Sequence, residues 1–135
     1  MRVSKKAQYG LRAMVYLARH SSKNEVCPIK EISEKEKIPF DFLEKIISEL
    51  QEAGLVEAKK GVQGGYFLTK EPKEITAGEI VRVLESTVPV SCLGCQMAKI
   101  CSTRDVWDKV QDSLDSTLDS MTLADLIKPK NVKKK

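Results

Sequence analysis

The chain has 135 residues, enough for one domain with a small appendage. A composition of 41% hydrophobic and 31% charged residues excludes a disordered chain, and no apolar run approaches the roughly 20 residues of a membrane-spanning helix. The net charge of +4 divides into a basic segment 1–70, an acidic segment 71–127 and a lysine-rich end 128–135, which favours a polyanion-binding first half.

Three helices are predicted at the start of the chain. Residues 4–20 carry apolar side chains every three or four positions, which is typical of an amphipathic helix. Residues 29–36 and 40–53 form two shorter helices, because Pro39 disfavours a helical residue before it and Gly54 is placed to end the second helix. Two short helices across a tight break predict a helix-turn-helix.

A β-hairpin is predicted next. Residues 55–58 and 66–69 are strand-like runs, and the K-K-G-V-Q-G-G between them places Lys59 and Lys60 beside glycines that permit a tight turn. A helix-turn-helix followed by a hairpin with a basic tip predicts a winged helix. An ordinary α+β domain with a surface hairpin is the alternative.

The second half is predicted to be helical. The capping box T-A-G-E at 76–79 opens a helix through Glu85, and a long helix runs from Ser102 to about Ser120. The apolar stripe of this long helix is too long for so small a domain to cover, so we expect a second copy of the chain to cover it in a homodimer. The stripe consists of Val106, Trp107, Val110, Leu114, Leu118 and Met121.

These elements define the predicted fold class, mainly α with a small β-hairpin wing. Residues 1–70 form a winged helix-turn-helix DNA-binding domain. Residues 71–127 form dimerisation helices with a cysteine-rich loop at 88–101, and residues 128–135 form a disordered basic tail.

Five residues are candidates for DNA contacts. The N-terminal residues of a recognition helix face base edges, which here are Asp41, Glu44 and Lys45. Glu44 is suited to accept from a cytosine amino group, and Lys45 to reach guanine or a phosphate. Lys59 and Lys60 are suited to phosphate or the minor groove. The alternative is that Glu44 and Lys45 are solvated surface charges.

Three cysteines lie within ten residues, at Cys92, Cys95 and Cys101. The N-terminus lacks the hydrophobic segment of a signal peptide, so we expect a cytoplasmic protein whose thiols stay reduced. The spacing is typical of a metal site for iron–sulfur or zinc, because soft thiolates suit both. A dithiol switch at Cys92 and Cys95 is less favoured, since that chemistry uses C-x-x-C at a helix start after a strand.

Four segments in order resemble one known family. They are M-R-V-S-K-K-A-Q-Y-G-L-R-A-M, F-L-E-K-I-I-S-E-L-Q-E-A-G-L-V, G-V-Q-G-G-Y-F-L and E-I-T-A-G-E-I-V-R-V-L-E. Together they look like the bacterial winged-helix family of IscR, NsrR and CymR. The resemblance implies a dimer that binds operator DNA, with most of its interface on the long C-terminal helix. It also implies base or groove contacts for Glu44, Lys45 and Lys60, while Pro39 departs from the family's usual helix-capping serine.

The resemblance also implies a cofactor. IscR-like members carry an iron–sulfur cluster on three cysteines before the long helix, which match Cys92, Cys95 and Cys101. The C-x2-C spacing is shorter than the family's but is itself a common chelating spacing. We expect a 2Fe–2S cluster in preference to 4Fe–4S, with zinc as the alternative.

The fourth ligand has no direct match. Arg104 stands where IscR has a histidine and stays protonated, and Gln8 stands where some relatives supply an acidic residue from the partner subunit. Asp105 is the best local oxygen ligand. Cys27 lies at an apolar position and is expected to be a buried structural cysteine.

The function predicted from these features is a redox, nitric oxide or iron–sulfur sensing repressor whose affinity for operator DNA is controlled by the cluster. The alternatives are a DNA-binding regulator with a structural zinc or thiol site, or a CymR-like regulator controlled by a protein partner. An enzyme is not expected, because the single histidine, His20, has no evident nucleophile or carboxylate partner.

Overall fold

The computed structural model describes residues 3–85 and 102–128, and it has the mainly helical fold with one hairpin that the sequence predicts. Within those ranges, no helix is long and apolar enough to cross a membrane. The predicted tail beyond Lys128 lies outside the described residues. The elements are α1 (Lys5–His20), α2 (Ile29–Glu36), α3 (Phe40–Glu52), β1 (Val56–Lys59), β2 (Gly65–Leu68), the 3-10 turn η1 (Pro72–Glu74), α4 (Ala77–Leu84), α5 (Arg104–Ser120) and α6 (Leu123–Ile127).

The helix ends follow local signals in the sequence. Ser4 caps α1 by accepting a hydrogen bond from the Ala7 backbone N–H at 3.1 Å, and Thr76 forms the predicted capping box with Glu79 at the start of α4. Gly54, with φ +82°, follows α3 as predicted. The long helix begins at Arg104, two residues later than expected, because Ser102 and Thr103 form a turn.

The break between α2 and α3 is a hydrogen-bonded turn. Lys37 adopts the left-handed conformation, φ 58°, and ends α2. The Ser33 hydroxyl donates to the Ile38 carbonyl at 2.6 Å, and the Ile38 side chain is buried in the core. Pro39 then occupies the N-cap position of α3, where its missing N–H costs nothing. The turn therefore holds the two helices of the predicted helix-turn-helix in place.

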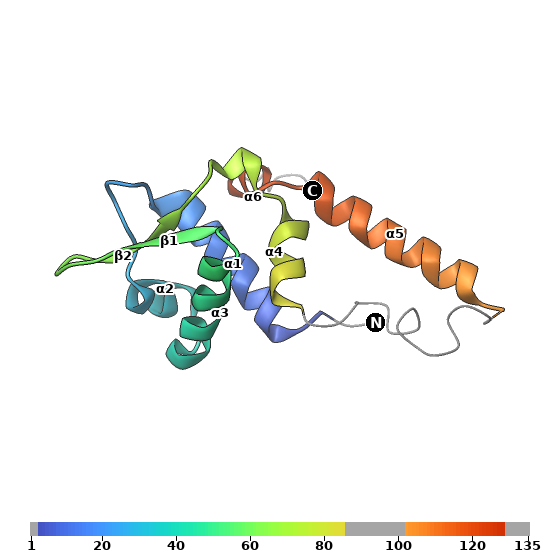
Figure 1. Cartoon of the computed structure of the whole chain (residues 1–135), viewed down its shortest axis with the longest axis horizontal. Coiled ribbons are helices and arrows are strands. Elements are labelled where there is room, and N and C mark those ends of the chain that lie inside the picture. Colours follow the sequence, from blue (N-terminus) through green and yellow to red (C-terminus); the bar gives the residue numbers. More distant parts are fainter. Residues whose placement is uncertain (1–2, 86–101, 129–135) are drawn as a thin grey trace, which may run out of the picture.

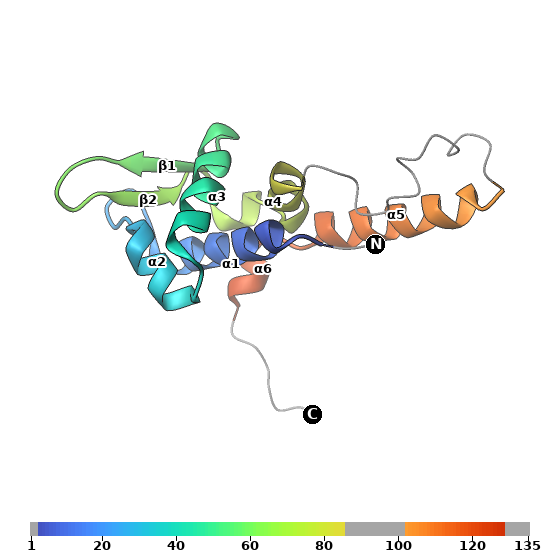
Figure 2. The same cartoon turned by 90° about the horizontal axis from the view of Figure 1, so that it is seen from below.

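Helix α1 is the centre of the core. It contacts α2, α3, α4, α6 and β2, and its Met14 and Leu17 are fully buried. Seen from two directions, the hairpin and α5 extend to opposite sides of this helical core (Figures 1 and 2). The other fully buried large side chains are Ile32, Ile38, Leu43, Ile46, Ile47, Leu50, Val56, Ile75, Ile80 and Leu123.

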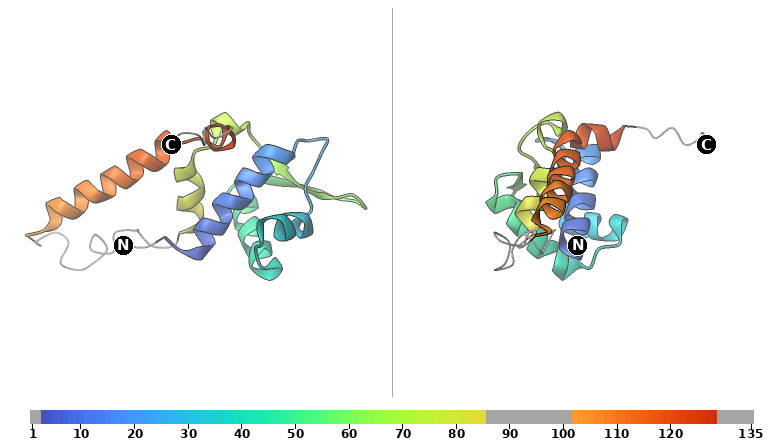
Figure 3. Two further views of the ribbon diagram at one scale, coloured as in Figure 1. Left: turned by 180° about the vertical axis from the view of Figure 1, so that it is seen from behind. Right: turned by 90° about the vertical axis from the view of Figure 1, so that its right-hand side faces the viewer.

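Helix α5 projects from the core and is attached to it at its C-terminal end (Figure 3). Arg82 of α4 donates two hydrogen bonds to the Asp119 carboxylate, at 2.8 and 2.9 Å, and Gly78 leaves room for that carboxylate. The chain then returns to the core, since Leu123 N–H donates to Ile75 O at 2.9 Å and the Leu123 side chain is buried.

Helix α5 carries a partly exposed apolar stripe, of which Leu118 packs against the core. None of its residues is buried, and two stripe residues, Val106 and Met121, are 55% and 40% exposed. The described residues thus leave this stripe partly exposed, and the second copy of the chain that would cover it stays a prediction.

Candidate nucleic-acid interface

The exposed side of α3 brings together the three residues predicted to read bases. Asp41, Glu44 and Lys45 line an open hollow of about 640 Å³, with Ser48 and Glu49. The opposite side of the helix is buried, because Leu43, Ile46, Ile47 and Leu50 all enter the core. The helical period thus presents one polar face of α3 to the outside.

The charges on this face are mostly not compensated. Glu49 pairs with Lys6 of α1 at 2.8 Å between Oε2 and Nζ. Asp41 and Glu44 form no ion pair among the described residues. A carboxylate brought to DNA is repelled by phosphates, but it can accept a hydrogen bond from a cytosine amino group. The two acidic side chains therefore suit base edges in the major groove better than the sugar–phosphate backbone.

The hairpin forms the predicted wing next to α3. The strands are antiparallel with Val56 opposite Leu68 and Lys59 opposite Gly65, and the Gly64 N–H donates to Gly61 O at 3.0 Å to close the tip. Helix α3 contacts β1. Lys59 and Lys60 are exposed and unpaired within the described ranges, so both charges are available to an anion.

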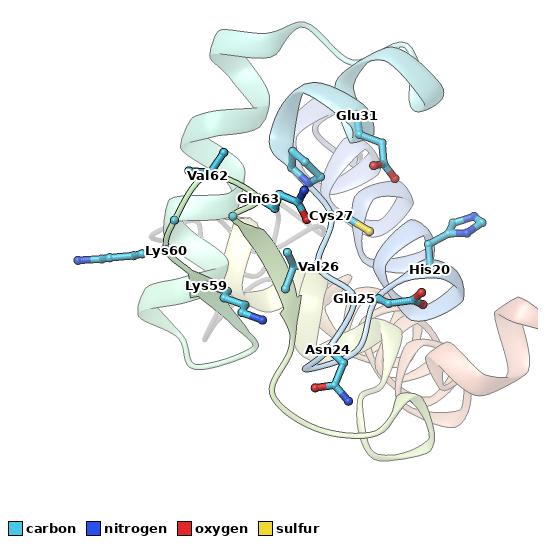
Figure 4. A pocket seen from close by; sticks show the side chains of 13 residues that line it. His20, Asn24, Glu25, Val26, Cys27, Glu31, Lys59, Lys60, Val62 and Gln63 are labelled. Carbon is cyan, nitrogen blue, oxygen red and sulfur yellow. The ribbon is translucent and has the colours of Figure 1, made fainter.

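A second hollow of about 840 Å³ lies between the wing and the end of α1 (Figure 4). His20, Cys27 and Glu31 border it from one side, Lys59 borders it from the wing, and the Lys60 side chain points away from it. No sequence pattern indicates this hollow, because its lining comes from four separate segments of the chain. The His20 ring packs against Tyr16, with ring centroids 4.4 Å apart.

Cys27 is buried at the base of the wing, as predicted. It is 2% exposed, and its backbone forms a two-bond bridge with Tyr66, at 3.0 and 2.9 Å. Burial, and then the neighbouring Glu31 carboxylate, raise the pKa of the Cys27 thiol to about 11. Burial and a hydrogen bond donated to Glu31 likewise raise the pKa of Tyr16 above its usual value.

The raised pKa predicts that the Cys27 thiol is alkylated slowly. In a Cys92→Ser/Cys95→Ser/Cys101→Ser variant, we expect iodoacetamide at pH 8 to modify native Cys27 at least about 100-fold more slowly than the denatured chain. The reason is that only about 0.1% of a thiol with that pKa is thiolate at pH 8. The rate should rise steadily with pH towards 11.

Glu31→Gln is the matched variant for this measurement. Removing the Glu31 charge lowers the pKa of the Cys27 thiol without opening its surroundings, so labelling should become faster while the native protein stays folded. Native and denatured rates within tenfold of each other would contradict this account of Cys27.

The predicted metal ligands Cys92, Cys95 and Cys101 lie outside the described residues. Among those described, no group of three or more His, Cys, Asp or Glu side chains could hold a metal. Asp105 lies exposed in the first turn of α5. The Cys27 backbone pairs with Tyr66 of β2, and the hairpin and the start of α5 lie at opposite ends of the molecule (Figures 1 and 3). Cys27 and Asp105 of one chain therefore cannot share a ligand set.

The candidate ligands rejected from the sequence have other contacts. Arg104 donates from Nε to Asp108 at 3.2 Å, and Gln8 donates from its amide to Val3 O at 3.0 Å. Asp105, exposed in the first turn of α5, stays the candidate oxygen ligand.

Comparisons with known proteins agree with this architecture. The Rrf2 family, described as "Iron-dependent Transcriptional regulator", matches residues 3–129. The regulator CymR of Bacillus subtilis is 37% identical over 93% of this chain and 89% of its own length. The regulator IscR of Serratia proteamaculans is 33% identical over 98% of this chain and 82% of its own length.

Solved structures give the same two groups of relatives. The T. potens IscR structure superposes with a TM-score of 0.82 at 37% identity, covering 100% of this chain and 93% of that one. The structure of CymR, the global cysteine regulator of B. subtilis, superposes with a TM-score of 0.78 at 38% identity, covering 94% and 96%. These similarities confirm the winged-helix fold, but they do not separate an IscR-like from a CymR-like protein.

Proposed function

The chain belongs to the Rrf2 family of transcriptional regulators, and from this premise we propose that it is a homodimeric repressor that binds operator DNA. The observation that carries the proposal is that two surfaces lie next to each other on the winged-helix domain, which we call the head. The polar face of α3 offers side chains that discriminate bases, and the adjacent wing offers uncompensated lysines.

Each surface has a separate task. Helix α3 lies in the major groove, where Asp41 and Glu44 accept from base amino groups and Lys45 donates to guanine or a phosphate. Lys59 and Lys60 bind phosphates or enter the minor groove at the wing. The first surface determines sequence preference, and the second supplies affinity that is independent of sequence.

The dimer is formed through α5. Its half-exposed stripe, including Val106 and Met121, is covered by the same stripe of a second copy, because a two-fold interface is self-complementary. The two hydrogen bonds from Arg82 of α4 to Asp119 of α5 attach each α5 helix to its own head. Two heads held in this way read the two half-sites of one operator.

Regulation comes from a cofactor held by Cys92, Cys95 and Cys101, an iron–sulfur cluster of the 2Fe–2S type, with Asp105 as the candidate fourth ligand. Three thiolates in ten residues are a suitable donor set for this group. When bound, such a cluster would be the part of the protein that reacts with oxygen or nitric oxide, or that is lost when iron is scarce. The segment that carries it joins α4 to α5, and hence the head to the dimer helix.

Two other modes of regulation remain as candidates. Zinc suits three thiolates and one carboxylate and would make the site structural. A CymR-like regulator controlled by a protein partner is the other candidate, since the chain is 37–38% identical to the B. subtilis CymR and equally, at 37%, to the T. potens IscR. Iron, sulfide and zinc analysis of anaerobically purified protein distinguishes all three candidates.

DNA binding is tested by separating the tasks of the two surfaces. We expect Lys59→Ala/Lys60→Ala to weaken binding to all duplexes at least about tenfold, and to reduce the slope of log K against log salt by about one unit for each lysine lost. Glu44→Ala should instead relax base preference at one position per half-site. Fluorescence anisotropy at several salt concentrations measures both effects.

Lys109→Ala is the control, because Lys109 is an exposed lysine of α5, away from the wing. It should leave the salt slope unchanged. The division of tasks would be wrong if the wing variant and Glu44→Ala weakened all sequences alike.

A further inference from the structure

Large apolar side chains are exposed at five described positions, Val3, Phe40, Val62, Val106 and Met121. Val106 and Met121 belong to the stripe proposed to form the dimer. Of the others, Phe40 is the first residue of α3, and therefore lies at the end of the helix that enters the major groove.

Phe40 does not take part in the core. Its side chain is 44% exposed, whereas Phe42, two residues later, packs edge-on against Tyr9 with ring centroids 5.5 Å apart. Both residues are aromatic, so composition does not separate them. The difference is their position on the helix, because a step of two residues turns the side chain to another side of α3.

Phe40 shares a side of α3 with Glu44. Residues four apart on a helix are neighbours on its surface, and Glu44 is exposed on the face proposed to read bases. The phenyl ring thus lies at the edge of a face whose other members are polar or charged. An exposed ring is unfavourable in water, and its burial would contribute to binding.

The major groove presents one apolar group, the C5-methyl group of thymine. On the basis of the proposed DNA binding, we propose that Phe40 contacts a thymine methyl group and makes thymine a required base in each half-site. Four residues of helix span about 6 Å, and successive bases of one strand are about 3.4 Å apart. The thymine therefore lies within about two base-pair steps of the base read by Glu44.

Deoxyuridine tests this contact directly, because it differs from thymidine only by the methyl group. The probe is the duplex that the full-length protein selects from a random library, with each thymine replaced in turn by deoxyuridine. For one thymine of each half-site we expect binding to weaken about fourfold, and about 15-fold when both half-sites are changed. Replacing the same thymine by 5-methylcytosine, paired with guanine, should bind better than unmethylated cytosine.

Combining Phe40→Ala with the deoxyuridine duplexes completes a double-mutant cycle between the protein and the DNA. This variant should bind the thymine and deoxyuridine duplexes equally, and Phe40→Leu should keep part of the discrimination. Val62→Ala is the matched control, because Val62 is an exposed apolar residue at the wing tip and should leave the discrimination unchanged. Thermal unfolding of each variant confirms that the fold is kept.

The proposal is overturned if deoxyuridine is tolerated at every thymine, or if Phe40→Ala discriminates as strongly as the unmodified protein. Either result leaves the proposed DNA binding intact. Failure to select any duplex would refute the proposed function itself, and this contact with it.

Discussion

Replacing Cys92, Cys95 and Cys101 by Ala is expected to remove all bound iron and sulfide, together with the visible absorption band near ~400 nm. The physical reason is that thiolates are the ligands of the proposed cluster, and removing all three leaves only Asp105 among the proposed donors. Iron and sulfide analysis and an absorption spectrum of anaerobically purified protein measure the loss.

Cys27→Ala is the matched control for this experiment. Cys27 is buried against Tyr66 at the base of the wing, so its removal should leave iron, sulfide and spectrum unchanged. Zinc in the unmodified protein, or no metal after attempted reconstitution, would exclude the cluster while leaving the DNA-binding proposal untouched.

The same variants test whether the cofactor regulates DNA binding. Only a difference in operator affinity between the loaded and the empty protein can make the cofactor a switch. We therefore expect the triple variant to bind the selected operator with an affinity close to that of the metal-free protein and different from that of the loaded protein. Equal affinities of loaded and metal-free protein at matched salt would rule out this control.

Gly65→Ala is expected to lower the free energy of unfolding by about 3 kcal/mol. An added Cβ at Gly65 would lie 2.6 Å from the carbonyl carbon of Cys27, 2.7 Å from its oxygen and 2.8 Å from the nitrogen of Pro28. These are backbone atoms, and hydrogen bonds to Tyr66 hold Cys27 in place. The strand must therefore move away from the backbone of Cys27 and Pro28. Urea unfolding monitored by circular dichroism measures the loss of stability. Because the wing is displaced, the variant should also bind DNA more weakly.

Gly54→Ala is the control for the steric argument. Gly54 has φ +82° but open space around its Cβ position, so alanine there costs only the strain of the left-handed conformation, about 1 kcal/mol. A loss for Gly65→Ala no larger than that for Gly54→Ala would show that the strand can shift without penalty.

The order and type of the elements are determined by the sequence, because their signals are local. Ser4, Thr76 and Thr122 cap helices through hydrogen bonds to residues three positions away. The polar face of α3 follows from the helical period alone, which is why Glu44 and Lys45 could be named before their surroundings were known. The role of the three cysteines remains a prediction from spacing and resemblance.

The tertiary structure decided what depends on contacts between distant parts of the chain. Gly65 lies against the backbone of Cys27, 38 positions earlier, and Arg82 bonds Asp119, 37 positions later. The Phe42 ring packs against Tyr9, whereas Phe40 does not belong to the core cluster. No local pattern encodes such pairings, because they arise only when separate elements pack. The sequence thus determined which residues form the exposed polar face of α3, and packing determined which aromatic ring beside that face stays exposed.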